Sequence, residues 1–328
     1  MEADIVARVG VPFISIPGGG VHGVALLNAL RNGWELSRGV FVALGAMRRE
    51  RPDALLTTGG YVSGPVSVAA RWLGVPILVY LPDIEPAQSV KAAGRLAARI
   101  AITVEDSRQF LPAHKVVVTG YPLGERITRW TRHAGRTALG LDAEVPVLLV
   151  FGGSRGARSI NRAFMPHVPT LSQWAYILHI SGKLDWSEVE EARKRLPTEV
   201  QARYRLYPYL HEEMGAAMAA ADLVVCRAGA STLGEFPHFG LPSVLVPYPY
   251  AWRYQRVNAD WLANRGAAIV VEDADLPAQI VPVVRGLLTD PARRSVMAKA
   301  ARTLAQPDAA RRLATELLAL AHKSAKAK

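Results

Sequence analysis

The chain has little of two features that would stabilise it covalently or anchor it in a membrane: cysteine and long apolar runs. Its 328 residues include one cysteine, Cys226, so no disulfide can form within the chain, as is typical of reducing compartments. The longest apolar runs, such as 75–81 and 145–151, are far shorter than the roughly 20 residues of a membrane-spanning helix. The first residues, Met1-Glu2-Ala3-Asp4, are acidic where a signal peptide is basic. We therefore expect a soluble or peripheral protein.

Basic residues outnumber acidic ones in both end regions of the chain, and the net charge of +11 is unevenly spread. Residues 1–139 hold 16 Lys and Arg against 10 Asp and Glu, residues 140–284 hold 13 against 15, and residues 285–328 hold 10 against 3. A basic face suits anionic lipid, nucleic acid or solubility alone. The sequence has no zinc-finger spacing and no RNA-binding aromatic signature, so we expect no nucleic-acid partner.

Short apolar segments alternate with amphipathic ones, which is typical of α/β layers with parallel sheets. In the first half, the pattern predicts strands at 54–57, 76–80 and 116–119 and helices at 66–73 and 94–100. In the second half, it predicts strands at 147–151, 175–180, 204–207, 222–226 and 243–246 and helices at 157–164, 186–195, 212–220 and 232–239. We expect two Rossmann-like domains that face each other across a cleft. Their expected ranges are 1–135 and 136–307, joined by an interdomain connection at 123–144, with a last helix at 308–322 that packs back on the first domain.

Two strand ends in the second half lead into small-residue turns. The strand at 147–151 is followed by Gly152-Gly153-Ser154-Arg155-Gly156-Ala157-Arg158, whose glycines let backbone N–H groups approach a phosphate. Arg158 would complete such an anion site, although a tight turn without a ligand explains the glycines equally well. The strand at 222–226 leads into a second turn at 227–231 and a helix near Ser231 or Thr232, whose hydroxyls also suit helix caps.

Glu235 lies one turn into that helix, where no apolar surface explains it, and it suits the hydroxyls of a ribose. A third polar segment, 247–259, follows the next strand and suits a sugar, or is an ordinary surface loop. In open parallel sheets, ligands bind at the carboxyl ends of the strands, where all three segments lie. The second half therefore reads as a nucleotide-sugar site.

Four segments together resemble one family, the MurG-like N-acetylglucosaminyltransferases of the bacterial cell wall. They are 151–158 with Asn161, 221–232 with Glu235, Gly59-Gly60-Tyr61-Val62-Ser63-Gly64-Pro65, and Val118-Thr119-Gly120-Tyr121-Pro122. The resemblance covers nearly the whole chain, in order and with suitable spacing. It implies a two-domain glycosyltransferase of the B type, whose C-terminal half binds UDP-N-acetylglucosamine.

The resemblance also implies site residues on both sides of the reaction. The donor side comprises Gly153, Ser154, Arg158, Ser181, Met214, Ser231, Thr232, Glu235 and Gln255. Within this set, Met214 would lie near the uracil, Thr232 at the diphosphate and Gln255 at the sugar. The family often has His-Gln where this chain has Tyr254-Gln255, so the histidine is absent or replaced. The acceptor side comprises Gly59, Gly60, Tyr61 and Ser63.

Two departures from the family concern the acceptor side. The family opens with a strand and a Gly-Gly-Thr-Gly-Gly-His loop, which this chain lacks, so we expect an incomplete N-terminal domain and an internal methionine at Met1. His22, in the glycine-rich segment 17–23, is not a substitute, because that segment lies too close to Gly59. Near 80–86 the family has His-Glu-Gln-Asn, whereas here Asp83 and Glu85 are the candidates for a general base. A proline-bounded turn with solvated acids is the alternative.

No metal or cofactor is expected. Asp273-Ala274-Asp275 matches an Asp-x-Asp metal motif in form only and predicts a turn with a helix cap. The expected reaction is inverting transfer of N-acetylglucosamine from UDP-N-acetylglucosamine to a lipid-linked diphosphate sugar, with the muramoyl-pentapeptide precursor of peptidoglycan as the implied acceptor. The expected location is peripheral, on the anionic cytoplasmic face of the cell membrane. The alternatives are a non-catalytic nucleotide-sugar-binding subunit and a UDP-N-acetylglucosamine epimerase of the same fold.

Overall fold

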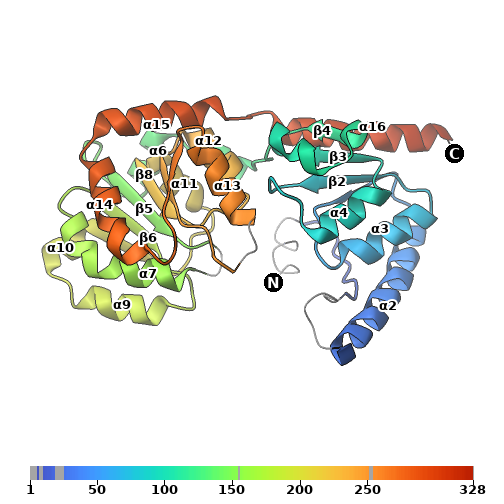
Figure 1. The fold of residues 1–328 in the computed structure, drawn as a ribbon, viewed down its shortest axis with the longest axis horizontal. Coiled ribbons are helices and arrows are strands. Elements are labelled where there is room, and N and C mark those ends of the chain that lie inside the picture. The colour runs from blue at the N-terminus through green and yellow to red at the C-terminus, as the bar shows by residue number, and fades with distance from the viewer. Residues whose placement is uncertain (1–5, 7–9, 19–25, 154–155, 251–253, 328) are drawn as a thin grey trace. The chain divides into compact units, whose positions relative to one another are not determined.

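The computed structural model describes residues 6, 10–18, 26–153, 156–250 and 254–327, and the chain forms two compact units (Figure 1). Unit 1 consists of Met1–Thr119 together with Arg311–Lys328, and unit 2 consists of Gly120–Ala310. Each unit contains its own parallel β-sheet. The first boundary therefore lies earlier in the chain than the expected residue 135.

Unit 1 is built on a four-stranded parallel sheet in the order β1-β2-β3-β4. Its strands are β1 (Leu55–Thr57), β2 (Ile77–Leu81), β3 (Arg99–Ile102) and β4 (Val116–Val118). Its helical segments are α2 (Leu26–Glu50), α3 (Ser63–Trp72), α4 (Gln88–Leu96), the 3-10 turns η1 (Glu105–Phe110) and η2 (Ala113–Lys115), and α16 (Ala309–Ala327). The strand order follows the chain order because each strand is joined to the next by a helical crossover.

Strand β2 is buried on both faces, and its side chains alternate between two cores. Val79 packs into the core formed with α2, α3 and α4. Leu78 and Tyr80 point to the other face, where they pack with Leu313 and Leu320 of α16. The last helix of the chain therefore completes the second layer of unit 1.

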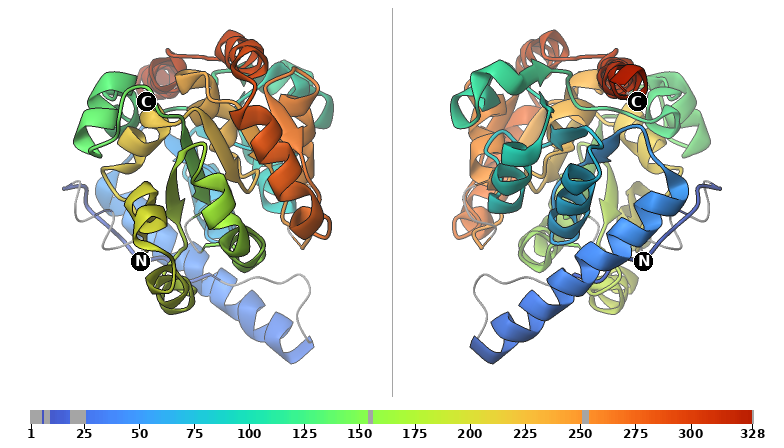
Figure 2. Two further views of the ribbon diagram at one scale, coloured as in Figure 1. Left: turned by 90° about the vertical axis from the view of Figure 1, so that its left-hand side faces the viewer. Right: turned by 90° about the vertical axis from the view of Figure 1, so that its right-hand side faces the viewer.

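Helix α2 has 25 residues, and Figure 2 shows it projecting away from the strands of unit 1. Ala43, Leu44 and Met47 bury one stripe of it in the unit 1 core. Trp34 and Phe41 lie on its other side, where each remains 71% exposed. In the part of the chain that the structure describes, no helix is long and apolar enough to span a membrane.

The helix predicted at 94–100 is wrong in its second half. Helix α4 ends at Leu96, and strand β3 begins at Arg99. The local composition favours a helix, but Ile100 and Ile102 pair with neighbouring strands on both sides and are fully buried. Tertiary pairing has overridden local propensity here.

Unit 2 is built on a six-stranded parallel sheet in the order β10-β9-β8-β5-β6-β7. Its strands are β5 (Val147–Phe151), β6 (Tyr176–Ile180), β7 (Tyr204–Tyr207), β8 (Leu223–Cys226), β9 (Ser243–Leu245) and β10 (Ala268–Val270). The first five confirm the predicted strands to within one residue at each end, whereas β10 was not predicted.

Helices cover both faces of the unit 2 sheet. They are α5 (Glu125–Thr128), α6 (Arg132–Ala138), α7 (Arg158–Phe164), η3 (Met165–His167), α8 (Val168–Leu171), α9 (Trp186–Lys194), α10 (Thr198–Arg203), α11 (Met214–Ala220), α12 (Thr232–Phe239), α13 (Tyr254–Ala263), α14 (Leu276–Leu288) and α15 (Pro291–Thr303). Leu148 and Val150 of β5 pack into the core shared with α7, α8 and α14. Phe151 faces the other way and contacts Phe236 of α12, with ring centroids 6.5 Å apart. Both faces are apolar, as a parallel sheet requires.

The segment expected to connect the domains, 123–144, belongs to unit 2. Helix α6 packs so closely on α11 that a Cβ atom on Gly135 would lie 2.5 Å from the carbonyl oxygen of Ala216. A Cβ atom on Gly215 would lie 2.5 Å from the Trp130 ring. Gly135, which lies in the predicted connection, therefore permits close packing of two helices within unit 2.

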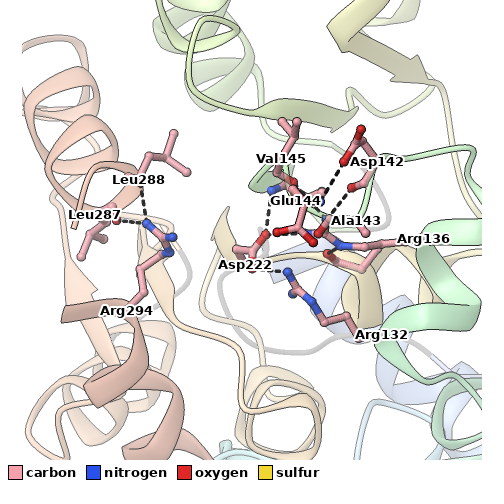
Figure 3. Close-up of polar contacts among 12 residues, drawn as sticks. Arg132, Arg136, Asp142, Ala143, Glu144, Val145, Asp222, Leu287, Leu288 and Arg294 are labelled. Carbon is pink, nitrogen blue, oxygen red and sulfur yellow. Dashed lines mark hydrogen bonds and ion pairs between the residues drawn. The ribbon is translucent and has the colours of Figure 1, made fainter. Parts of the chain in front are cut away.

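Arg136 of α6 forms hydrogen bonds with several backbone carbonyl groups just before β5 (Figure 3). Its side chain is almost fully buried, and its guanidinium donates to the carbonyl oxygens of Asp142, Ala143 and Val145 at 2.6, 2.6 and 3.0 Å. It also donates to Asp222 Oδ2 at 2.7 Å. A planar guanidinium with five N–H groups suits such a set of acceptors.

Asp222, just before β8, is the shared partner of this cluster. Its Oδ2 accepts the N–H of Val147 at 2.8 Å, and its Oδ1 accepts from Arg132 at 2.7 Å. The carboxylate therefore joins the amino ends of the two central strands, β5 and β8, to helix α6.

Replacing Arg136 should destabilise unit 2 strongly. Arg136→Met removes the buried partner of Asp222 and leaves the carbonyl oxygens of Asp142, Ala143 and Val145 without this donor, so the free energy of unfolding should fall by about 3–5 kcal/mol. Arg132→Met is the matched control, because Arg132 pairs with the same carboxylate but is 51% exposed, and it should lose less than about 1 kcal/mol. Urea unfolding followed by tryptophan fluorescence measures both, and equal losses would contradict the structural role of the buried Arg136.

Candidate functional site

The carboxyl ends of the unit 2 strands lie at one level. Phe151, at the end of β5, pairs with Ile180 at the end of β6 and with Cys226 at the end of β8. Cys226 in turn pairs with Leu245 at the end of β9. The chain leaves β5 toward β6 on one side and returns through β8 on the other, so the strand order reverses at β5. Open parallel sheets bind ligands at such a reversal. We call the carboxyl ends of β5, β6, β8 and β9, together with the turns that follow them, the donor edge.

The turn after β5 is so tight that it requires glycine. A Cβ atom on Gly152 would lie 2.1 Å from the backbone nitrogen of Ala157. Gly156 has φ +81°, and a Cβ atom there would lie 2.5 Å from the carbonyl oxygen of Ser181. Gly153, with φ +89°, accepts the N–H of Gly156 at 3.0 Å. The predicted donor residue Gly153 therefore lies in a compact turn of the kind that presents N–H groups to an anion.

Three predicted donor residues near this turn differ in their accessibility. Arg158, the first residue of α7, has a side chain that is 60% exposed, and its Nε donates to Asp185 Oδ1 at 2.8 Å. Ser181 is fully buried, and its hydroxyl donates to the carbonyl oxygen of Gly182 at 3.3 Å. Ser154 lies outside the described residues. The donor edge thus presents the guanidinium of Arg158 to solvent and turns the hydroxyl of Ser181 inward.

The turn after β8 runs directly into α12. Thr232 is buried, and both its N–H and its hydroxyl donate to the carbonyl oxygen of Gly229, at 3.0 and 2.7 Å. Ser231, the N-cap residue, accepts the N–H of Glu235 on its carbonyl oxygen at 2.9 Å. The Thr232 hydroxyl, which the sequence predicts at a diphosphate, therefore holds the shape of this turn.

Glu235 is half-buried in the first turn of α12. Burial raises the pKa of its carboxyl to about 7, and the rise is opposed by a hydrogen bond with Ser231 and by the positive charge of Arg126. Near neutral pH the group is therefore divided between its charged and neutral forms. A carboxyl in this condition beside a strand-end turn is a candidate functional group.

An ion-pair cluster that the sequence did not predict ties the donor edge together. Arg227, directly after β8, pairs with Asp273 Oδ1 at 2.5 Å and donates to Ser159 Oγ at 2.7 Å. Ser159, on α7, donates to the same Asp273 oxygen at 2.8 Å. The Arg227 guanidinium also lies 5.2 Å from the ring centre of Tyr248. An arginine between an apolar strand and a glycine turn is the one sequence signal for this cluster.

The third predicted segment, which follows β9, is described at 247–250 and 254–259. Gln255 of α13 accepts the backbone N–H of Tyr248 at Oε1, at 2.9 Å. Asn258, fully buried in the same helix, donates to the carbonyl oxygen of Ala228 at 3.2 Å and fixes α13 against the turn after β8. Met214 begins α11, the helix that leads into β8, so it lies at the same edge of the sheet.

The predicted acceptor residues form a second tight turn, in unit 1, between β1 and α3. Gly59 and Gly60 have φ +92° and +91°, values that favour glycine. Ser63 donates to the carbonyl oxygen of Gly60 at 2.8 Å, and the Gly60 N–H donates to Ser89 Oγ at 3.3 Å. Tyr61, at the tip of the turn, is 67% exposed.

Asp83 and Glu85 follow β2 at the same edge of the unit 1 sheet, and both are half-buried. The Thr103 hydroxyl lies 2.9 Å from the carbonyl oxygen of Pro82 and 2.9 Å from the hydroxyl of Tyr80, which fixes the backbone just before Asp83. The segment leads into α4, whose Ser89 holds the Gly60 turn, so the two predicted acceptor elements are neighbours.

The Asp-x-Asp segment has a structural role. Residues 273–275 form a turn before α14, and Asp275 occupies the N-cap position without a side-chain capping bond. Asp273 is held by Arg227. Among the residues that the structure describes, no group of three or more His, Cys, Asp or Glu side chains could hold a metal ion.

Two family models match the chain. Residues 147–313 match the glycosyltransferase family 28 C-terminal domain, and residues 1–102 match the family 28 N-terminal domain. A relative from Roseiflexus sp. (strain RS-1) is 42% identical, and the match covers 96% of this chain and 80% of the relative. That relative is named a UDP-N-acetylglucosamine--N-acetylmuramyl-(pentapeptide) pyrophosphoryl-undecaprenol N-acetylglucosamine transferase.

Solved structures agree with the family models. The crystal structure of Acinetobacter baumannii MurG matches with a TM-score of 0.73 and 27% identity, and the match covers 97% of this chain and 88% of that one. A UDP-GlcNAc 2-epimerase from Neisseria meningitidis, bound to UDP-GlcNAc, has a TM-score of 0.67 at 13% identity, with coverage of 97% and 88%, which is a likeness of fold alone. The predicted two-domain glycosyltransferase fold of the B type is confirmed. The chain belongs to glycosyltransferase family 28.

Proposed function

We propose that this chain transfers N-acetylglucosamine from UDP-N-acetylglucosamine to N-acetylmuramyl-(pentapeptide) pyrophosphoryl-undecaprenol, the reaction in the name of its 42% identical relative. The observation that carries the proposal is the donor edge itself. A glycine turn, an exposed Arg158 and a half-buried Glu235 all lie at the strand ends where the sheet order reverses. These are the groups that a nucleoside diphosphate requires.

Each part of the donor has a suitable group at this edge. The carboxylate of Glu235 accepts the two ribose hydroxyls, and Met214 lies at the uracil. The turn at Gly153, the amino end of α12 at Ser231 and the guanidinium of Arg158 surround the diphosphate. Buried Ser181 and Thr232 support this edge through the turns they stabilise. Gln255, which secures the segment after β9, lies at the sugar.

The reaction is a single displacement with inversion. The acceptor hydroxyl attacks C1 of the sugar, a base takes its proton, and UDP leaves from the opposite side. Asp83 and Glu85 are the candidate bases, beside the turn that carries Gly59, Gly60 and Tyr61. Arg158 and the backbone N–H groups of the donor edge stabilise the charge that develops on the departing diphosphate, which we expect to be the largest contribution to the rate.

The lipid-linked acceptor requires access to a membrane surface. Trp34 and Phe41 lie two turns apart on α2, each 71% exposed, with the exposed Arg38 between them. Trp72, on the neighbouring helix α3, is 65% exposed and follows Arg71. Apolar side chains interleaved with arginine suit the surface of an anionic bilayer. We infer that unit 1 binds the membrane peripherally through this face.

The alternative function, a UDP-N-acetylglucosamine epimerase, is supported only by likeness of fold.

Donor affinity should depend on the ionisation of Glu235. Because the pKa of its carboxyl is about 7, lowering the pH from 8 to 6 protonates it and removes a charged acceptor of the ribose hydroxyls. Affinity for UDP-N-acetylglucosamine, measured by calorimetry, should therefore fall by about tenfold over this range. Glu235→Gln should flatten this dependence, and Glu235→Ala should weaken binding at pH 8 by about 1.5–3 kcal/mol. A wild type that folds but binds no UDP-N-acetylglucosamine would contradict the proposed function.

Removing both candidate bases should affect the chemical step and spare donor binding. The double variant Asp83→Asn, Glu85→Gln should lower kcat by about 10²–10⁴-fold, because the acceptor hydroxyl loses its proton acceptor. Its dissociation constant for UDP should match the wild type, since both residues lie in unit 1. Sugar transfer to a lipid-linked diphosphate acceptor measures kcat, and the single variants then identify the base. Undiminished transfer by the double variant would exclude both carboxylates.

Membrane binding should depend on the exposed aromatic side chains of α2. Trp34→Ser with Phe41→Ser should lower the affinity for vesicles that contain phosphatidylglycerol by about tenfold or more. Higher salt should weaken the remaining binding, because surface charges are screened within roughly 8–10 Å. Leu184→Ser is the control, since Leu184 is 77% exposed but lies in unit 2. Co-sedimentation that is unchanged in the double variant would place the membrane contact elsewhere.

A further inference from the structure

A line of hydrogen bonds runs beneath the donor edge, from Tyr204 at the start of β7 to Arg158 at the start of α7. The Tyr204 hydroxyl lies 2.7 Å from His179 Nδ1, and His179 Nε2 lies 2.9 Å from Asn161 Oδ1. Asn161 Nδ2 donates to Asp185 Oδ2 at 3.0 Å, and Asp185 Oδ1 accepts from Arg158 Nε at 2.8 Å. Every member except Arg158 is almost fully buried.

The direction of every bond in this line follows from its partners. Asn161 Nδ2 contacts Asp185 and the carbonyl oxygen of Ser181, at 2.9 Å, and both partners only accept. The amide oxygen of Asn161 must therefore face His179, whose Nε2 carries the proton. Burial lowers the pKa of His179 to about 3, so its ring stays neutral and Nδ1 is an acceptor. The Tyr204 hydroxyl donates to Nδ1 at 2.7 Å in preference to Met165 Sδ, a weaker acceptor at 3.1 Å. All donors thus point toward the carboxylate of Asp185.

The side chain of Asp185 does not cap the helix that it precedes. It occupies the N-cap of α9, where an aspartate commonly accepts a backbone N–H, yet its side chain makes no capping bond. Both carboxylate oxygens are directed to α7 instead. A cavity of about 150 Å³ lies beside this contact, lined by Arg158, Asp185, Met165 and Val189 among others. Packing therefore does not fix the Arg158 side chain on this side. Its hydrogen bond to Asp185 does.

We propose that Tyr204, His179, Asn161 and Asp185 form a positioning relay that fixes the guanidinium of Arg158 for the diphosphate of the donor. The four residues touch no substrate and act through Arg158. Asn161 adds a second connection, because its bond to the Ser181 carbonyl oxygen holds the end of β6 beside the glycine turn. The proposal rests on the proposed function, since that function makes Arg158 a donor-binding residue.

The test is Asp185→Asn, which keeps the size of the side chain. The amide has one oxygen where Arg158 and Asn161 each require an acceptor, so one donor must face another donor. The dissociation constant for UDP, measured by calorimetry, should rise about three- to tenfold as Arg158 loses its fixed orientation. Glu188→Gln is the matched control, because Glu188 pairs with Arg162 across the same two helices at the surface, and it should leave the constant unchanged.

A double-mutant cycle separates positioning from general damage to the fold. In an Arg158→Ala background, Asp185→Asn should have no further effect on UDP binding, because the residue through which it acts is gone. The same loss in both backgrounds would overturn the relay, and so would an Asp185→Asn variant that binds UDP like the wild type. Absence of UDP binding by the folded wild type would overturn the proposed function, and the relay's role with it.

The direction of the relay can be tested without any variant. Nitrogen-15 NMR of the wild type should show His179 neutral, protonated at Nε2 and bare at Nδ1, from pH 8 down to pH 5. A proton on Nδ1, or a charged ring at pH 5, would overturn the assignment.

Discussion

The functional geometry of unit 2 depends on one constraint: β5 pairs in register with β6 on one side and β8 on the other. Because Phe151, Ile180 and Cys226 end their strands at one level, the turns that follow must share a small space. Gly152 and Gly156 are the consequence, since a Cβ atom at either would overlap neighbouring backbone. The site is thus produced by strand pairing first and by side chains second.

Charged groups buried near the central strands are held at fixed positions by several partners each. At the amino ends, Arg136 joins α6 to the backbone before β5 and to Asp222. At the carboxyl ends, Arg227 and Asp273 join the turns after β8 and β10. Burying such charges is favourable only with this degree of pairing, and the pairing leaves few ways for the strand ends to move. We propose that an edge held in this way is pre-organised for an anionic ligand.

Local patterns sufficed for most of unit 2, because its strands are short apolar runs ended by turn residues. The helix at 232–239 was predicted with both ends correct. It ends at Phe239 because Gly240, which follows, adopts φ +61°. The strand at 99–102 was missed, because only pairing with β2 and β4 makes its alanine and two isoleucines a strand. The Arg227 cluster was missed for a related reason: its partners Ser159 and Asp273 lie 68 and 46 residues away in the chain.

The hydroxyls of the donor motifs show why a motif predicts a location better than a role. Thr232 and Ser181 were expected to meet the donor, yet both are buried and donate to nearby carbonyl oxygens. A motif contains residues that bind the ligand and residues that only hold the turn in shape. Both kinds occupy fixed positions in the motif, so the spacing alone does not tell them apart. Exposure separates them: the Arg158 side chain is 60% exposed and Glu235 is half-buried, whereas Thr232 and Ser181 are buried. We therefore propose that Arg158 and Glu235 recognise the donor, together with the backbone that Thr232 and Ser181 hold in place.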